Sequence, residues 1–167
     1  MRSRIIATGG YVPERILGND EIAARLGVTA DWIVKLTGIR ERRVAAATET
    51  TSDMAAAAAR RALDSASIDP ASIDLIVVGT VTPDCPTPAT AALVQAKIGA
   101  SRAFAFDLSA ACVGGLYAMS VADQFIRTGA VKRALVIGAE LLSRSIDWED
   151  RNTCILFGDG AGALVLE

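Results

Sequence analysis

The residue of this chain best placed for chemistry is Cys112, which lies in the stretch AFAFDLSAACVGGLYAMSVADQFI from Ala103 to Ile126. Apolar residues 103–108 predict a short strand, the small residues after them predict a tight turn, and a helix is expected to begin near Ala111. A cysteine in the first turn of a helix meets free backbone N–H groups and the positive end of the helix dipole, which favour a thiolate over a thiol. A nucleophile on a sharp turn between a strand and a helix forms a nucleophile elbow, here with cysteine in place of serine. The sequence therefore predicts that Cys112 is a covalent nucleophile, with its own backbone N–H as the nearest donor to an oxyanion.

Two glycines that follow Cys112 affect how closely a substrate can approach it. Gly114 and Gly115 keep the start of the helix slim, so that another backbone or a substrate can approach closely. The alternative interpretation is structural, because a lone cysteine among alanines and glycines is often a small buried core residue. Position alone leaves both interpretations of Cys112 open.

The elements that must position Cys112 follow an alternating pattern. Continuous apolar runs bounded by turn residues, such as DLIVVG and RALVIG, predict strands that are buried on both faces of a parallel sheet. Strands are expected at 4–7, 74–79, 103–108 and 133–138, with a closing pair at 154–157 and 163–166. Helices are expected at 19–26, 29–38, 51–66, 89–98 and from 111 onward. Strands that alternate with helices predict an α/β layer with helices on both faces of the sheet.

Capping residues set the expected ends of these helices. Asn19 or Asp20 is expected to cap the first helix, Thr29 the second, and Thr51 or Ser52 the long alanine-rich one. The first strand is expected to end at the pair Gly9–Gly10, and the first helix at Gly27.

Three further tracts are expected to be irregular or exposed. The basic tract Gly38–Arg43 is expected to be exposed, and Ser143–Asn152 is expected to form a polar, charged loop. The run Gly158–Gly162 lacks the spacing of a phosphate-binding loop, so it is interpreted as a structural turn between the two closing strands.

Composition narrows the class of protein. The 167 residues carry a net charge of −2, which gives no reason to expect a nucleic-acid partner. The chain has no histidine and its three cysteines form no CxxC pair, so a Cys/His zinc site is excluded and a reducing compartment is expected. No run approaches 18 apolar residues and the N-terminus is too short in apolar length for a signal peptide, so we expect a cytoplasmic protein without a membrane segment.

The motif DLSAACVGGLYAM around Cys112 resembles the active-site segment of the β-ketoacyl-acyl carrier protein synthase III family, in the thiolase superfamily. The resemblance extends to the tracts TADWIVKLTGIRERRVA and DWEDRNTCILFGDGAGA and covers essentially the whole chain. It implies an α/β, thiolase-like fold, namely one βαβαβαββ half of a five-layer αβαβα architecture. Residues 1–167 would then be the N-terminal half, which carries the nucleophilic cysteine. The C-terminal half, which supplies a histidine and an asparagine in the family, is expected to lie outside this chain.

The resemblance also implies a coenzyme A site. Trp32 stands where a family tryptophan stacks on adenine, Arg151 matches the second side chain that flanks the adenine, and Thr37 is expected to contribute to the same site. The alternative for Trp32 is that it packs beneath its own helix. The family usually has an arginine just before the Thr-Gly-Ile-Arg string, whereas this chain has Leu36 there, which puts the usual thioester carrier in question.

The proline-rich loop Thr82–Pro88 is implied to reach across a homodimer to the acyl channel of the partner. Some relatives that use short primers place a bulky aromatic residue where Thr87 stands. A threonine leaves space there, which predicts acceptance of primers longer than acetyl. The alternative is that Thr87 only stiffens the loop and that another side chain closes the channel.

The activity implied by the resemblance is the initiating condensation of type II fatty-acid synthesis. The Cys112 thiolate would take an acyl group from acyl-coenzyme A and pass it to the carbanion formed when malonyl-acyl carrier protein loses carbon dioxide. Coenzyme A thioester is then a substrate, and no permanently bound cofactor or metal is expected. Two alternatives remain: a related acyltransferase or condensing enzyme of polyketide or other secondary metabolism, and a non-catalytic half that only packs against a partner.

Overall fold

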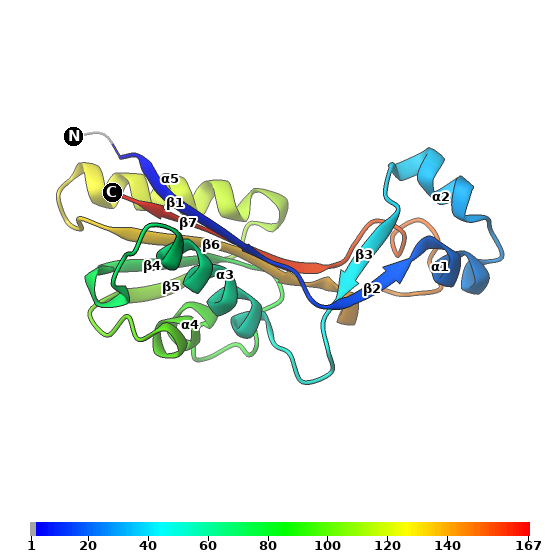
Figure 1. The fold of residues 1–167 in the computed structure, drawn as a ribbon, viewed down its shortest axis with the longest axis horizontal. Coiled ribbons are helices and arrows are strands. Elements are labelled where there is room, and N and C mark those ends of the chain that lie inside the picture. The colour runs from blue at the N-terminus through cyan, green and yellow to red at the C-terminus, as the bar shows by residue number, and fades with distance from the viewer. Residues whose placement is uncertain (1–2) are drawn as a thin grey trace.

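The computed structural model describes residues 3–167 and is built around one mixed β-sheet (Figure 1). Its five strands lie in the order β1-β7-β6-β4-β5. Three of them (β4, β5 and β6) are parallel, and β7 runs antiparallel to both β1 and β6. The strands are β1 (Ile5–Tyr11), β4 (Leu75–Gly79), β5 (Phe104–Leu108), β6 (Ala134–Leu141) and β7 (Asp159–Leu166).

Helices cover both faces of this sheet. On one face, α3 (Thr51–Ser65) and α4 (Thr90–Ile98) pack their alanine and valine side chains against alternate residues of the central strands. On the other face lies α5 (Gly114–Arg127), which packs on the intervening residues of β4 and β6. Figure 1 shows α5 on the opposite side of the strands from α3 and α4. The order β1-α3-β4-α4-β5-α5-β6-β7 is the predicted βαβαβαββ layer.

An insertion of residues 15–44 separates β1 from α3. It contains β2 (Arg15–Gly18), α1 (Asn19–Leu26), α2 (Ala30–Thr37) and β3 (Glu41–Val44), with β2 and β3 paired antiparallel. In Figure 1 the insertion lies beyond one end of the main sheet. It has its own apolar core, which Cys154 and Ile155 from the segment before β7 complete.

The helix ends lie where the capping residues predict them, except that the N-caps of α1 and α3 are not the predicted residues. Thr29 caps α2 by accepting a hydrogen bond from the Trp32 N–H, as predicted, and Gly27 ends α1 in the left-handed conformation. The cap of α3 is Thr50 rather than Thr51 or Ser52, because Thr50 and Asp53 form a reciprocal capping box. The cap of α1 is Gly18 rather than Asn19 or Asp20, and no side chain caps this helix.

The predicted end of the first strand is wrong. Strand β1 continues through Gly9 and Gly10 to Tyr11. Helix α3 crosses β1 so closely that a Cβ atom on Gly9 would lie 2.3 Å from the Ala62 nitrogen. Gly9 is therefore required by helix-on-strand packing and not by a turn.

Only the second strand of the predicted closing pair is present, since residues 163–166 lie in β7. Residues 154–156 form turns in place of the first strand, and most of the predicted Gly-rich turn belongs to β7 as well. The Asp159 carboxylate fixes the start of β7, because it accepts hydrogen bonds from the Ala45 N–H at 2.7 Å and from the Ser143 N–H at 2.8 Å. The predicted turn is therefore wrong, since residues 159–162 lie in a strand whose start the Asp159 contacts hold in place.

The basic tract Gly38–Arg43 is not uniformly exposed as predicted. Arg42 in β3 is only 5% exposed, and its guanidinium donates hydrogen bonds to the side chain of Asn19 and to the carbonyl of Ile155. This burial lowers the pKa of Arg42 from its ordinary value. Arg42 thus ties β3 to α1 and to the segment before β7.

Among the helices of residues 3–167, none has both the length and the apolar character needed to cross a lipid bilayer.

Candidate active site

Cys112 lies in a short 3₁₀ turn, Ala111–Val113, between the end of β5 and the start of α5. The predicted order of strand, tight turn and helix is confirmed, but the α-helix proper begins at Gly114, two residues after the cysteine. Ala111 has a positive φ of 46°, which is uncommon for a residue with a side chain and marks a sharp turn. The Cys112 side chain is exposed, so the interpretation of this cysteine as a buried core residue is wrong.

The slim start of α5 depends on a glycine that sequence reasoning missed. A Cβ atom on Gly79, the last residue of β4, would lie 2.8 Å from the Gly114 carbonyl carbon and 2.9 Å from the Gly115 nitrogen. A Cβ atom on Gly114 would make only ordinary contacts, and one on Gly115 would meet open space. The close approach at the elbow is therefore made by β4, and Gly79 is what allows it.

An apolar cavity of about 410 Å³ opens beside the Cys112 turn. Its walls come from α5, β1, β6 and β7, and include Thr8, Leu116, Met119, Val136 and Leu164. The side chain of Leu116, one turn into α5, is 59% exposed. The thiol thus stands at the margin of an apolar surface, which suits a hydrocarbon chain or a packed protein face.

The other two cysteines differ from Cys112 in exposure. Cys85 is partly buried and Cys154 is completely buried. Burial, together with the nearby Asp150 carboxylate, raises the pKa of the Cys154 thiol. All three cysteines, which lie within residues 3–167, are free thiols.

The residues predicted for the coenzyme A site lie in and next to the insertion. Trp32 on α2 is half-buried and packs partly against the core of the insertion. Thr37 ends α2, and its hydroxyl donates to the Ile33 carbonyl at 2.8 Å and accepts from the Ile39 N–H at 3.0 Å. Leu36 is 60% exposed, and Arg151 is exposed in the turns before β7. The structure thus brings Trp32 and the segment of Arg151 to one core, apart from the layer that holds Cys112.

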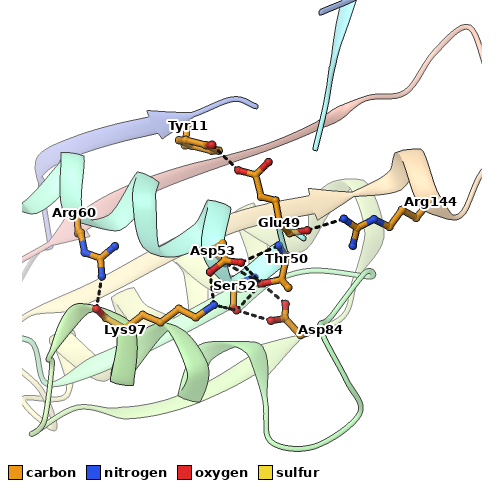
Figure 2. Close-up of polar contacts among 9 residues, drawn as sticks. All are labelled: Tyr11, Glu49, Thr50, Ser52, Asp53, Arg60, Asp84, Lys97 and Arg144. Atoms are coloured by element: carbon orange, nitrogen blue, oxygen red, sulfur yellow. Dashed lines mark hydrogen bonds and ion pairs between the residues drawn. The ribbon is translucent and has the colours of Figure 1, made fainter. Parts of the chain in front are cut away.

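Thr87 is exposed near the end of the loop Thr82–Pro88. The first part of this loop is fixed by hydrogen bonds that sequence reasoning missed: the Thr82 hydroxyl donates to the Glu140 carboxylate at 2.6 Å, and Asp84 accepts from the Ser52 N–H at 2.8 Å. Figure 2 shows Asp84 beside Ser52 at the start of α3, with Lys97 on the other side. The only signal in the sequence was the Thr-Pro-Asp string, which is typical of a fixed turn.

Comparison with known proteins gives one consistent family. Residues 106–167 match the family described as 3-oxoacyl-[acyl-carrier-protein (ACP)] synthase III. The chain is 57% identical over its whole length to the β-ketoacyl-[acyl-carrier-protein] synthase III of Bradyrhizobium sp. (strain BTAi1), of which it covers 52%.

Two solved structures match the fold closely. The 3-oxoacyl-[acyl-carrier-protein] synthase III from Aquifex aeolicus VF5 has a TM-score of 0.95 and 49% identity, over 98% of this chain and 53% of that one. The priming β-ketosynthase from the R1128 polyketide biosynthetic pathway also has a TM-score of 0.95, with 43% identity over 99% of this chain and 49% of that one.

The chain spans about half the length of the curated relatives it matches. Sequence identity extends over essentially the whole chain, and the solved relatives share its thiolase-like layer. Over its whole length the chain is therefore similar to about half of a β-ketoacyl-[acyl-carrier-protein] synthase III.

Proposed function

We propose that this chain is the N-terminal, nucleophile-bearing half of a 3-oxoacyl-acyl carrier protein synthase III. Cys112 attacks the thioester carbonyl of an acyl-coenzyme A; a new carbon–sulfur bond forms and the coenzyme A thiolate leaves. Malonyl-acyl carrier protein then loses carbon dioxide, and the resulting carbanion attacks the acyl-cysteine. The product is a 3-oxoacyl-acyl carrier protein, and the Cys112 thiolate is regenerated.

The observation that carries this proposal is the exposed thiol of Cys112 on a sharp turn beside an apolar cavity. A nucleophile on a strand-to-helix turn is accessible, and the backbone N–H groups at the start of the helix can stabilise the oxyanion of a tetrahedral intermediate. Acyl transfer through a thioester needs no redox group and no metal. We therefore propose that coenzyme A acts here only as the leaving group of a substrate.

The test uses the complete protein with an acyl-coenzyme A and malonyl-acyl carrier protein. Mass spectrometry is expected to detect an acyl adduct on Cys112 when the malonyl substrate is omitted, and 3-oxoacyl-acyl carrier protein when it is present. An adduct without condensation product would point to acyl transfer alone. Absence of both would contradict the proposal.

A second half is part of the proposal because the chain contains no histidine. The family histidine and asparagine, which stabilise the enolate formed on decarboxylation, would come from that half. The exposed apolar side chains of Leu116 and Tyr117 on α5 are a suitable surface for it to cover. We further propose that the complete protein is a cytoplasmic homodimer, with neither nucleic acid nor membrane as a partner.

We propose that Trp32, Thr37 and Arg151 form the mouth of the coenzyme A site. Trp32 supplies a flat apolar face for the adenine ring, and the exposed guanidinium of Arg151 can stack and donate hydrogen bonds. Because the Thr37 hydroxyl is engaged within its own helix end, we assign it a shaping role at this mouth.

In the complete protein, Trp32→Ala is expected to raise KM for acyl-coenzyme A by about tenfold, since base stacking on an aromatic ring is of that order. Arg151→Ala should raise KM in the same direction. Both variants should change kcat little, because the adenine lies far from the reacting thioester and its contacts are alike in ground and transition states. Steady-state kinetics measure both constants, and Asp31→Ala, an exposed change on the same helix, serves as control. A fall in kcat with unchanged KM would contradict the assignment.

Leu36→Arg tests the identity of the thioester carrier. Leu36 is exposed, so an arginine fits there without repacking. If coenzyme A is the carrier, the added guanidinium should lower KM for acyl-coenzyme A. An unchanged KM would favour an acyl carrier protein as donor.

Thr87→Phe is expected to shift primer selectivity toward acetyl, because we propose that the loop Thr82–Pro88 contributes to the acyl channel of the partner subunit. Each buried methylene contributes about 0.8 kcal/mol and octanoyl has six more methylenes than acetyl, so closing the channel should lower kcat/KM for octanoyl- relative to acetyl-coenzyme A by about 1,000-fold or more. Thr87→Ser, which keeps the space, should leave the ranking unchanged. A wild type that already prefers acetyl strongly, or an unchanged ranking in Thr87→Phe, would refute the channel assignment.

A second candidate function is favoured by two observations. The R1128 priming β-ketosynthase is 43% identical to this chain with the same fold, and Leu36 stands where the family usually has an arginine. The alternative proposal is therefore a priming condensing enzyme or acyltransferase of polyketide metabolism. Comparing kcat/KM for acyl-coenzyme A with that for acyl groups on carrier proteins from the two pathways separates the proposals.

A further inference from the structure

The loop Thr82–Pro88 is held firmly where it begins and only weakly where it ends. The Thr82 carbonyl accepts from the Thr51 hydroxyl at 2.5 Å, while the Thr82 hydroxyl donates to Glu140 and accepts from the Leu141 N–H. From Cys85 to Pro88, in contrast, the single side-chain hydrogen bond within residues 3–167 is the long one from the Cys85 thiol to the Pro88 carbonyl, at 3.6 Å. Asp84 lies between these two parts, so its contacts determine the position of the exposed end of the loop.

Asp84 is bound to the first turn of α3. Its Oδ1 atom accepts from the Ser52 N–H at 2.8 Å, and its Oδ2 atom accepts from the Ser52 hydroxyl. Ser52 is completely buried, whereas Asp84 is exposed. A carboxylate on a backbone N–H in the first turn of a helix gains from both a charge-assisted hydrogen bond and the helix dipole.

Lys97 of α4 completes this contact from the opposite side (Figure 2). Its Nζ atom donates to the Ser52 hydroxyl oxygen and to Asp53 Oδ1, both at 2.6 Å. Although partial burial opposes it, these hydrogen bonds and those from Thr50 hold the pKa of Asp53 below its ordinary value. We call Asp84, Ser52 and Lys97 the latch.

The far end of the loop is joined to the nucleophile by a second carboxylate. Asp107 on β5 accepts from the N–H groups of Thr90 and Ala91, both at 2.7 Å, and so caps the start of α4. Strand β5 leads directly into the turn that holds Cys112. Asp107 thus fixes the helix start that follows the loop and the latch fixes Asp84, so the intervening residues 85–88, which make few hydrogen bonds of their own, depend on these two anchors for their position.

We propose that Asp84 is a positioning residue for acyl-chain selection: by binding the first turn of α3, it holds the Thr87 end of the loop in place, and with it the wall that this loop contributes to the acyl channel of the partner subunit. The inference rests on the proposed acyltransferase function and on the proposed place of Thr87 in the acyl channel. Without the latch, the loop adopts many positions and discriminates less between short and long acyl chains.

Hydrogen exchange in the complete protein tests the latch itself. Asp84→Ala should speed exchange of the amide of Ser52 and of the hydrogen-bonded loop amides of Val81 and Thr82 by about tenfold, as expected for loss of a charge-assisted hydrogen bond. Asp84→Asn, which keeps the shape but not the charge, should give a smaller increase. Asp64→Ala removes an exposed carboxylate near the other end of α3 and should leave these amides unchanged. Unchanged exchange in Asp84→Ala would overturn the proposal.

Acylation of Cys112 by acetyl-, octanoyl- and dodecanoyl-coenzyme A, followed by mass spectrometry, tests selectivity. In Asp84→Ala the ratio of the dodecanoyl to the acetyl rate should rise by about tenfold, while the rate of Cys112 alkylation by iodoacetamide stays that of wild type. A merely structural effect would change the alkylation rate or lower all acylation rates alike. Ser52→Ala should act in the same direction, and adding it to Asp84→Ala should cause little further change, because both remove one interaction.

The outcomes separate the two proposals. If the wild type takes no acyl group from any thioester, the proposed function fails, and the selectivity role of Asp84 fails with it. If the wild type is acylated and Asp84→Ala keeps the wild-type ratio of rates, the function stands and the role of Asp84 is overturned.

Discussion

Replacing Cys112 by alanine is expected to abolish the acyl adduct that the complete wild-type protein forms with acyl-coenzyme A. The reason is chemical: without the sulfur there is no nucleophile to hold the acyl group, and the turn places no other nucleophilic side chain at this position. Intact-protein mass spectrometry measures the adduct. Cys85→Ala, which removes a thiol outside the turn, serves as control and should keep the adduct. An adduct that persists in Cys112→Ala would contradict the assignment of the nucleophile.

Alkylation of the folded wild type gives an independent measure. Near neutral pH, iodoacetamide should label Cys112 first, because it is exposed, whereas Cys85 is partly buried and Cys154 is buried. Cys154 should react last, because it is completely buried and its pKa is raised by that burial. Peptide mapping after timed alkylation gives the order. Equal labelling of the three cysteines in folded protein would count strongly against Cys112 as the nucleophile.

Much of the fold could be predicted because its signals are local. The run DLIVVG predicts β4 from apolar continuity alone, and every residue of that strand is buried. Thr29 and Gly27 act through their own backbone neighbours, so the ends of α1 and α2 that they form are readable from a few residues. The nucleophile elbow is likewise a local pattern, which is why Cys112 was found.

The features that were missed depend on partners far away in the sequence. The sequence predicts that Gly9 ends a strand, yet Gly9 is needed because it allows the close approach of α3, some 50 residues later in the chain. Arg42 lies in a basic tract that the sequence predicts to be exposed. Its burial is evident only in the structure, where its guanidinium donates to the Ile155 carbonyl. No window of sequence contains both partners of such contacts, so periodicity and capping rules cannot detect them.

The residues of the candidate site also divide into those that the sequence pointed to and those that depend on distant partners. Trp32, Arg151 and Thr87 were proposed from resemblance, and their roles stay predictions. Asp84 was missed because a carboxylate in a proline-rich loop reads as an ordinary turn residue, and its contact with Ser52 lies 32 positions away in the sequence. Gly79 was missed because a glycine at the end of an apolar run reads as the end of a strand.

Gly79→Ala is expected to displace the start of α5 and, with it, the turn that holds Cys112. The added Cβ would lie 2.8 Å from the carbonyl carbon of Gly114, a distance that such atoms do not tolerate. Because the obstacle is backbone and not a flexible side chain, the start of α5 must shift and carry the Cys112 turn with it. Overpacking of this kind costs about 1–3 kcal/mol of unfolding free energy. A misplacement of about 1 Å at a reacting group costs about 100-fold in rate.

Gly138→Ala is the matched control for stability. Gly138 lies directly beside Gly79 in the parallel pairing of β4 and β6, yet a Cβ atom there would meet nothing within 4 Å. Denaturant unfolding of the complete protein should therefore show a loss for Gly79→Ala and almost none for Gly138→Ala. The acylation rate of Cys112 should fall by about 100-fold in Gly79→Ala, even under conditions where the variant is fully folded. Wild-type stability and acylation in Gly79→Ala would mean that β4 does not set the position of the elbow, and that the Cys112 turn is held by β5 and α5 alone.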